Sequence, residues 1–368
     1  MENEKTEAEL LREAQLEEQY KELLAKSPKR VVEEIKAIET GEKLPELYSD
    51  YAFKKQFDAD VHKDRLTKLL QMIFGFSLEV VSSLKNEAVL TSIYSKKSIL
   101  DILAKLSNNA VSNIEMQVVA QEFITKRIDV YCSDVILMQY SVQEGQKKED
   151  FDFNKIEKTY VAVLMKESPK LFRDNKSYIH RKLSITDTGI ELPSLEEVVY
   201  LELDKCLEQF KEGKIAASQE ELATWLSAIA DVNDSFVRDK MSGLKDMADI
   251  QNDLKNMRLN KEEMVAMLGE KYEQAVRYSE LNEAKRKGIE EGEKIGEARG
   301  KEIGIVEGEA RGKEIGIAQG EAKLKNIKML MSLLIRDNRN DDLMRAMEDE
   351  EFCMELYKEY GIENDAMN

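Results

Sequence analysis

Hydrophobic positions in the first half of the chain change from a helical to a strand-like period near Gly75. Between residues 50 and 75 the apolar residues recur mainly at three- and four-residue steps, which predicts an amphipathic helix packed on a core. These residues are Phe53, Phe57, Val61, Leu66, Leu69, Leu70 and Ile73. After Gly75 come runs rich in β-branched residues, which predict strands: LEVVSSL, AVLTSIY, SILDILA, AVSNIEMQVV and, later, TYVAVLM.

A second helical pattern, AQEFITKRIDVYCSDVILMQY, separates the fourth and fifth of these strand-like runs. The predicted order is helix, three or four strands, helix and strand, which in outline is an α/β sandwich. Beyond Glu202 the pattern is helical, and its most apolar segment is EELATWLSAIA. Trp225 in that segment is the only tryptophan, and we expect it to anchor the core. Between residues 231 and 287, methionines at helical spacing predict packing rather than cofactor chemistry.

Two acids interrupt the apolar strand-like runs: Asp101 in SILDILA and Glu115 in AVSNIEMQVV. The intervening segment, residues 107 to 109, is Ser-Asn-Asn, and asparagine tolerates the left-handed backbone region that a tight hairpin needs. A hairpin centred on Asn108 would place Asp101 directly opposite Glu115. The same register pairs Leu103 with Asn113 and Ile99 with Gln117 on that face, and Leu100 with Met116 and Ile102 with Ile114 on the other. The second face is wholly apolar and is predicted to lie on the core.

Opposed carboxylates in such a ladder would have Cβ atoms about 5 Å apart and would repel each other. A divalent cation could compensate, because two carboxylates with waters and a substrate phosphate are the usual protein environment of Mg²⁺. Two alternatives stay open at this point: a proton shared by the two acids, or a solvated strand face with Asp101 held by a backbone donor. A slip of one residue in the turn would place Asp101 opposite Met116 and remove the metal site.

Composition is consistent with at least one sizeable core that carries long helical arms. The chain has 368 residues, of which 42% are hydrophobic and 35% charged, with only four prolines. The three cysteines form no CxxC pair, so neither a disulfide framework nor a zinc site is indicated. No apolar run approaches the ~20 residues that span a bilayer. We therefore expect a cytoplasmic protein with no membrane partner.

The net charge of −18 argues at first against a nucleic-acid partner, because phosphate binding is driven by Lys and Arg. Its distribution weakens this objection. Residues 50 to 205 contain 22 Lys and Arg against 24 Asp and Glu, a net charge of −2, so the flanking segments carry the remaining −16. The two histidines have no metal-site spacing, and the sequence contains no GxSxG, Walker A or GxGxxG motif.

Six short segments, in this order, resemble the PD-(D/E)xK nuclease family transposases, also called Rpn-type recombination-promoting nucleases or putative transposases. They are DYAFKKQF at 50 to 57, KSILDI with Lys97 and Asp101, NIEMQ at 113 to 117, RIDVYCSDVILMQYSVQEG with Arg127, Tyr131, Ser133 and Gly145, YLELDK at 200 to 205, and TWLSAI at 224 to 229. The resemblance covers roughly residues 48 to 230 and strengthens the metal-site prediction.

The resemblance implies a restriction-endonuclease-like core, a central mixed sheet flanked by helices, that hydrolyses DNA phosphodiesters with Mg²⁺ or Mn²⁺. By position, Asp101 and Glu115 are the metal-binding catalytic acids. Gln117 is the third catalytic residue and stands where the broader superfamily usually has lysine. A glutamine can orient water but supplies no positive charge. The competing class is therefore a catalytically silent nuclease-fold module that binds nucleic acid or assembles through its helical tail.

Other residues are predicted to contact the substrate. Arg127 and Tyr131 lie at i and i+4 and so face the same neighbour, which would be a substrate phosphate, with Lys97 as a further phosphate contact. A surface stack of the arginine on the tyrosine is the alternative. The candidates for an additional acid from the first helix are Asp50, Asp60 and Asp64.

The segment SPKLFRDNKSYIHRK, residues 168 to 182, has five Lys or Arg against one Asp. Phe172 and Tyr178 are interleaved with these charges, a pattern that predicts a nucleic-acid contact loop. A solvated basic loop fits the same pattern.

Glycine occupies every fourth position from Gly288 to Gly320, and the 12 residues at 296 to 307 recur almost unchanged at 308 to 319. Glycine costs about 1 kcal/mol in a helix interior, so a helix is expected here only if packing compensates. A stripe of small residues permits close helix approach, between subunits or against the neighbouring tail. A solvated, half-formed helix or linker is the alternative.

The chain is thus predicted to have five segments: a charged helical extension (1–45), a nuclease-like core (46–230), a charged helical segment (231–287), the glycine repeat (288–320) and a C-terminal helical pair joined near Asp337 to Asp342 (321–368). We expect a Mg²⁺-dependent DNA endonuclease, linked to transposition or recombination, that forms a homo-oligomer through its coiled-coil-like C-terminal helices. A purely structural coiled-coil protein is disfavoured by the strand-rich middle.

Overall fold

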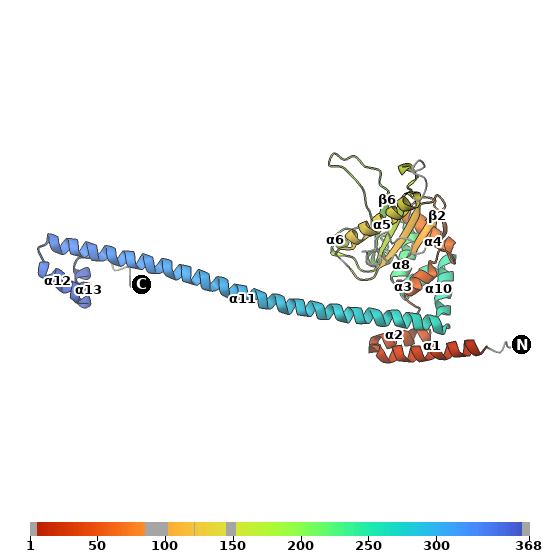
Figure 1. Cartoon of the computed structure of the whole chain (residues 1–368), viewed down its shortest axis with the longest axis horizontal. Helices are drawn as coiled ribbons and strands as arrows, with labels where there is room; N and C mark the ends of the chain where they lie inside the picture. The colour runs from red at the N-terminus through yellow and green to blue at the C-terminus, as the bar shows by residue number, and fades with distance from the viewer. Residues whose placement is uncertain (1–5, 85–101, 121, 145–151, 363–368) are drawn as a thin grey trace. The chain divides into compact units, whose positions relative to one another are not determined.

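The computed structural model of the protein describes residues 6–84, 102–120, 122–144 and 152–362 (Figure 1). The chain divides into two compact units, Met1–Tyr278 and Ser279–Asn368. The α-helices are α1 Glu7–Lys26, α2 Lys29–Glu39, α3 Asp50–Gln56, α4 Lys63–Phe74, α5 Ile124–Glu144, α6 Lys170–Arg173, α7 Leu203–Lys211, α8 Glu220–Ala230, α9 Ser235–Ser242, α10 Lys245–Met257, α11 Lys261–Arg336, α12 Asn340–Glu348 and α13 Glu350–Glu359. Short 3₁₀ helices span Phe153–Lys155 and Ala217–Gln219.

The first unit is built on a mixed six-stranded sheet with the order β1-β2-β3-β4-β6-β5. Its strands are β1 Val80–Ser83, β2 Ile102–Leu106, β3 Val111–Gln117, β4 Thr159–Met165, β5 Ile179–Arg181 and β6 Glu196–Glu202. Strands β1, β2 and β3 pair antiparallel, β3, β4 and β6 pair parallel, and β5 is antiparallel to β6. The prediction of a restriction-endonuclease-like mixed sheet flanked by helices is confirmed.

The hairpin between β2 and β3 has the predicted register. Ile102 pairs with Ile114 and Leu103 with Asn113, so the numbers of opposed residues sum to 216. Asn109 adopts a positive φ of 64°, as expected for an asparagine in a tight turn. Because the side-chain period is two, this register places Asn113, Glu115 and Gln117 on one face of β3.

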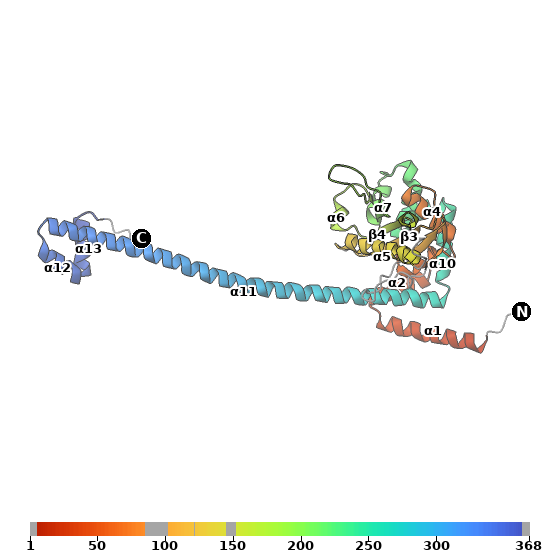
Figure 2. The same cartoon turned by 45° about the horizontal axis from the view of Figure 1, so that its top comes forward.

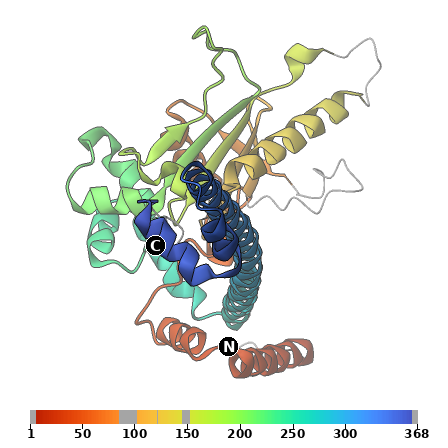
Figure 3. The same cartoon turned by 90° about the vertical axis from the view of Figure 1, so that its left-hand side faces the viewer.

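The two faces of the sheet are covered by different elements. The face predicted to be apolar does lie on the main core: Ile102 and Ile114 belong to the cluster that also contains Trp225 and residues of α4 and α8. Helix α5 covers the opposite face, where Ile124 and Ile128 pack on residues of β4 and β6 (Figure 2). Viewed from the side, α5 runs along one face of the strands, and the helices of the main core, such as α8, lie on the other face (Figure 3). Trp225 is fully buried, so its predicted role as a core anchor is confirmed.

The single helix predicted for residues 50 to 75 is wrong, because the segment forms two helices, α3 and α4. The break follows from Asp58, whose carboxylate accepts hydrogen bonds from the backbone N–H groups of Asp60, at 2.7 Å, and Val61, at 3.2 Å. An aspartate that bonds the backbone two and three residues ahead offers the chain an alternative to the helical hydrogen bonds.

Strands β5 and β6 were not among the strand-like runs identified from the sequence. β6 is the run EEVVYLE, whose last five residues are buried. Such a run belongs to a strand that is covered on both faces, so it lacks the polar alternation that identifies a half-buried strand. Its parallel pairing with β4 is what extends the sheet beyond the predicted strands.

The N-terminal helices pack on the first turns of α11 within the first unit. The largely enclosed side chain of Lys271 in α11 bonds Glu46 at 2.6 Å and Glu34 of α2 at 3.0 Å. Glu270 accepts the backbone N–H groups of Asp50, at 2.7 Å, and Tyr51, at 3.0 Å, and so caps the N-terminus of α3. The start of α11 is therefore an integral part of the sheet-containing unit. The five segments predicted from composition stay a prediction.

In the second unit, α11 is helical through all nine glycines of the repeat, although a Cβ added at any of them would meet nothing within 4 Å in the described part of the chain. The apolar cluster of this unit joins Leu330 and Leu334 of α11 to Leu356 and Tyr357 of α13. The second helix of the predicted C-terminal pair is divided into α12 and α13. Asp349 causes the division because its side chain accepts the N–H of Phe352 and caps α13. None of the helices in the described ranges is both long and apolar enough to cross a bilayer.

Candidate active site on the α5 face of the sheet

Three polar side chains occupy alternate positions of the central strand β3, on the face that α5 covers. Asn113, Glu115 and Gln117, which we call the polar row, are only 1%, 3% and 5% exposed. The partners opposite them are apolar: Leu103 on β2, and Val161, Val163 and Met165 on β4. The alternative in which Glu115 and Gln117 form a solvated strand face is therefore wrong. Burial of three polar groups in an apolar layer costs free energy that hydrogen bonds or ligands must offset.

Glu115 is bound by a cation from the covering helix. The guanidinium of Arg127, on the first turn of α5, contacts the Glu115 carboxylate through Nη2 and Oε1. The same guanidinium lies over the ring of Tyr131, with 5.5 Å between its central carbon and the ring centroid. The predicted i, i+4 pair of Arg127 and Tyr131 is thus present, and its guanidinium is directed at Glu115 on the sheet. The predicted contact of Arg127 with a substrate phosphate stays a prediction.

The two amides of the polar row differ in their hydrogen bonds. Gln117 donates from Nε2 to the carbonyl oxygen of Val119 at 2.7 Å, which leaves Oε1 as its available acceptor. Among the described residues, no hydrogen-bond partner is found for Gln117 Oε1 or for either polar atom of the Asn113 side chain. The row therefore presents, on both sides of Glu115, oxygen acceptors for which the described residues offer no partner.

The remaining residues of the predicted site, Asp101 and Lys97, lie outside the described residues, as does Gly145. The pairing of Asp101 with Glu115 rests on the register seen from Ile102 onward, and it stays a prediction. Within the described ranges, no cluster of three His, Cys, Asp or Glu side chains could hold a metal ion. The donor set of the polar row, one carboxylate and two amide oxygens, is nevertheless the hard oxygen chemistry that Mg²⁺ and Mn²⁺ prefer.

Of the three acids proposed from the first helix, Asp60 is the one bonded to the sheet. Its carboxylate accepts the backbone N–H of Ser83 in β1 at 2.9 Å and also the Ser83 hydroxyl. These hydrogen bonds lower the pKa of Asp60 below its usual value. Asp50 instead pairs with Lys54 at 2.6 Å on α3. The role of any of these acids in catalysis stays a prediction.

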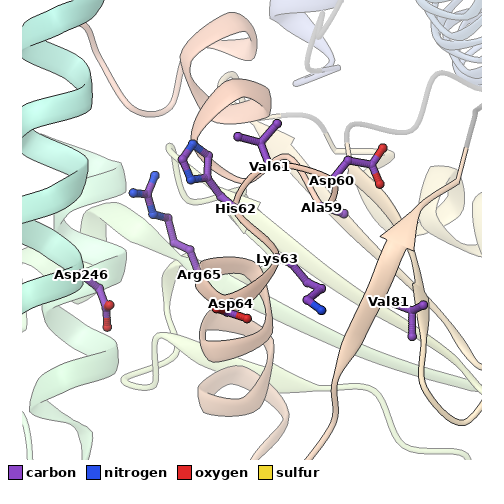
Figure 4. A pocket seen from close by; sticks show the side chains of 9 residues that line it. All are labelled: Ala59, Asp60, Val61, His62, Lys63, Asp64, Arg65, Val81 and Asp246. Atoms are coloured by element: carbon purple, nitrogen blue, oxygen red, sulfur yellow. The ribbon is translucent and has the colours of Figure 1, made fainter.

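Asp60 also lines a charged pocket of about 550 Å³ between the α3–α4 connection, β1 and α10. Figure 4 shows the side chains around it: Asp60 and Lys63 lie on the side of Val81 of β1, and Arg65 and Asp246 lie on the opposite side. The pocket is lined by β1 at the edge of the sheet, whereas Glu115 lies on the central strand β3.

The aromatic residues of the basic segment 168–182 are packing residues. Tyr178 is buried in the main core, and Phe172 packs on the α5-side cluster. Phe172 stacks on His180 with ring centroids 4.9 Å apart. The interleaved pattern therefore reflects α6 and β5 packing on the sheet: Tyr178 is buried, and Phe172 is half-buried against His180 and Tyr200. Lys170 and Lys176 are exposed, which agrees with the solvated-loop alternative for the basic side chains.

Sequence reasoning assigned no role to a second buried acid, Glu202, at the carboxyl end of β6. Its Oε1 contacts Lys205 Nζ at 2.5 Å and His180 Nε2 at 2.9 Å, and the residue is completely buried. Its position continues the alternation of Val198 and Tyr200, so it lies on the α5 side of the sheet. The run VVYLELDK contained a signal, because Glu202 ends an apolar strand, where a buried acid needs a partner, and Lys205 follows it by three residues.

The mixed sheet flanked by helices, with an acid in the middle of its central strand, is the restriction-endonuclease-like class of fold. A model of the PD-(D/E)XK nuclease family transposases matches residues 47–284, which is more than half of the chain. The chain belongs to this family, and membership connects it with nuclease and transposition-related functions. No curated protein and no solved structure gives a match.

Proposed function

We propose that the protein is a divalent-cation-dependent DNA endonuclease that hydrolyses phosphodiester bonds and acts in transposition or recombination. The observation that carries the proposal is the buried carboxylate of Glu115, set among amide oxygens on the central strand and contacted by a cation from α5. Burying a carboxylate this deep in an apolar layer costs free energy. Groups of this kind are concentrated at binding and catalytic sites, where the function retains them despite the cost.

In this proposal Glu115 and Asp101 would hold Mg²⁺ or Mn²⁺. The bound cation would supply Lewis acidity and lower the pKa of a water, so that hydroxide is available near neutral pH. Gln117 would orient the attacking water through Oε1, the atom that its bond to Val119 leaves available. Gln117 carries no charge, so the positive charge that a lysine would bring to position 117 must come from elsewhere.

Arg127 supplies that charge. Its guanidinium reaches Glu115 from the next helix, and its stacking on Tyr131 holds the planar group in a set direction. A guanidinium in this position can move from the carboxylate to a phosphate oxygen when DNA enters, because it binds both planar anions by paired hydrogen bonds. Lys97 is proposed as a further phosphate contact.

The C-terminal helices are proposed to join copies of the chain into a homo-oligomer. The helix through the glycine repeat exposes Ile303, Ile305, Ile315 and Ile317 in addition to the glycines. Nine glycines would weaken an isolated helix by about 1 kcal/mol each relative to alanine, so a packing partner would offset this cost.

A nicking assay tests the enzymatic proposal. We expect the purified full-length protein to nick supercoiled plasmid with Mg²⁺ or Mn²⁺, and Asp101→Ala and Glu115→Ala each to lower the rate at least about 100-fold, because a catalytic cation contributes several kcal/mol to the transition state. Glu208→Ala is the control, since Glu208 is an exposed acid on α7, which packs on the main-core side of the sheet.

The same assay distinguishes the enzyme from the second candidate function, a catalytically silent nuclease-fold module that binds nucleic acid. This candidate is favoured by the enclosure of Glu115, whose side chain is only 4% exposed and already contacts Arg127. Wild-type protein that binds duplex DNA but does not nick it with either metal, or nicking that survives both alanine changes, would exclude the proposed enzyme.

A further inference from the structure

Asn113 is buried without an apparent structural reason. The residue is 1% exposed, and within the described part of the chain no hydrogen-bond partner is found for its Oδ1 or its Nδ2. It pairs with Leu103 on β2 and Val161 on β4, and the nearby apolar cluster contains Leu103, Val111 and Val135 of α5. A leucine has the same branched shape as asparagine, with two methyl groups in place of the amide atoms, and would avoid the penalty of about 1–3 kcal/mol that a buried polar group without a partner carries.

The position of Asn113 relative to Glu115 suggests what its amide serves. The two residues are two positions apart on the same face of β3, so their backbones are about 7 Å apart. This spacing leaves room for a water molecule between the Asn113 amide and a cation at Glu115. A water bound to the cation would extend its reach by a hydrogen bond of about 2.8 Å, and Mg²⁺ usually keeps several of its waters in proteins.

We propose that Asn113 is a positioning residue whose side-chain amide hydrogen-bonds a water of the divalent cation held at Glu115. The inference rests on the proposed function and deepens it. Gln117 Oε1, the other acceptor for which no partner is found among the described residues, lies at the opposite side of Glu115 and would hold a water on that side. The polar row then acts as a hydrated strip through an otherwise apolar layer, and the stability lost by burying Asn113 is recovered only when the cation binds.

Two substitutions at this position should have opposite effects on stability and metal binding. Asn113→Leu should raise the melting temperature in EDTA by about 2–4 °C, because it removes a buried amide for which the described residues offer no partner. It should also weaken Mn²⁺ binding about 10-fold or more, the usual cost of losing a residue that orients a metal's ligands. Asn113→Asp should do the reverse, with a lower melting temperature in EDTA and a larger stabilisation by Mn²⁺.

The measurements are isothermal titration with Mn²⁺ and thermal unfolding in EDTA and with Mn²⁺, all on the full chain. Ser112→Ala is the matched control: Ser112 is adjacent and equally buried, and no partner is found for its hydroxyl among the described residues, but it points to the other face of β3. We expect this variant to bind Mn²⁺ like the wild type. An Asn113→Leu variant with wild-type Mn²⁺ affinity overturns the inference. If that variant does not fold, an Asn113→Asp variant with no added stabilisation by Mn²⁺ overturns it.

A Glu115→Gln variant distinguishes failure of this inference from failure of the proposed function. Loss of Mn²⁺ binding in Glu115→Gln together with unchanged binding in Asn113→Leu defeats the role of Asn113 alone. Unchanged Mn²⁺ binding in Glu115→Gln defeats the metal site itself, and the role of Asn113 with it.

Discussion

At the scale of single residues, the contact between Arg127 and Glu115 decides the electrostatics of the candidate site. Glu115 is almost completely enclosed, and a carboxylate in such surroundings is tolerated when a cation is close to it. Arg127 is partly exposed, with 26% of its side chain accessible, so it can leave the carboxylate without crossing the core. The arginine and a divalent cation would then be alternative neutralising partners of one acid.

The competition between Arg127 and a divalent cation for Glu115 predicts the stability of an Arg127→Met variant. Removal of the guanidinium should lower the free energy of unfolding in EDTA by about 2–3 kcal/mol, because one member of a largely buried ion pair is lost. Mn²⁺ should restore a larger part of that stability than it adds to the wild type, since the cation neutralises Glu115. Urea unfolding of both proteins, with EDTA and with Mn²⁺, measures the difference.

Lys126→Met serves as the control for this experiment, because Lys126 is an exposed cation on the same turn of α5. It should unfold like the wild type in both buffers. If Mn²⁺ stabilises Arg127→Met and the wild type equally, the two cations do not compete for Glu115.

At the scale of elements, the polar end of β6 anchors the segment that connects β4 to β6. Lys205 donates from Nζ to Glu202 at 2.5 Å, to the carbonyl oxygen of Asn175 at 2.7 Å and to that of Phe172 at 3.0 Å. One largely enclosed ammonium therefore ties the end of α6 and the turn before β5 to the first turn of α7. The segment that resembled a nucleic-acid contact loop in sequence is held against the sheet by this lysine.

Lys205→Met should destabilise the protein by about 3 kcal/mol, because it leaves the carboxylate of Glu202 buried without its ammonium partner. Lys176→Met, in the same segment but exposed, should change the free energy of unfolding by less than about 0.5 kcal/mol. Urea denaturation followed by circular dichroism compares the two variants. Equal stabilities would show that the Lys205 contacts do not anchor the segment.

At the scale of the whole molecule, contacts within the described part of one chain do not explain why the repeat has glycine at every fourth position. A Cβ added at Gly296, Gly304 or Gly312 would meet nothing within 4 Å, so no contact among the described residues requires a glycine at these positions. A glycine stripe is useful when a second helix approaches closely, as in the proposed homo-oligomer.

A triple alanine variant at these three glycines tests that use. We expect the helix content of the variant to rise, because each substitution favours the helix by about 1 kcal/mol. Its self-association should weaken, because the added methyl groups keep helices apart. Analytical ultracentrifugation and circular dichroism measure the two effects. Lys301→Ala, on the same helix, is the control, and unchanged self-association of the triple variant would exclude the glycine stripe from the subunit contact.

The sequence alone determined the features that depend on local periodicity. The period-two alternation around Asn108 and the asparagines of the turn set the register of β2 and β3, and with it the face on which Glu115 lies. The apolar run around Trp225 determined that α8 belongs to the core. These properties could be predicted because they depend on neighbours within a few residues along the chain.

Only the tertiary structure decided which distant residues meet. Strand β6 was identified only from its pairing with β4, because a strand buried on both faces has no polar alternation in its sequence. The pairing of Arg127 with Glu115, the absence of a described partner for Asn113, and the capping of α3 by Glu270 all depend on how helices pack on a sheet. Contacts between residues far apart in sequence leave no periodic signal, because the packing of whole elements creates them.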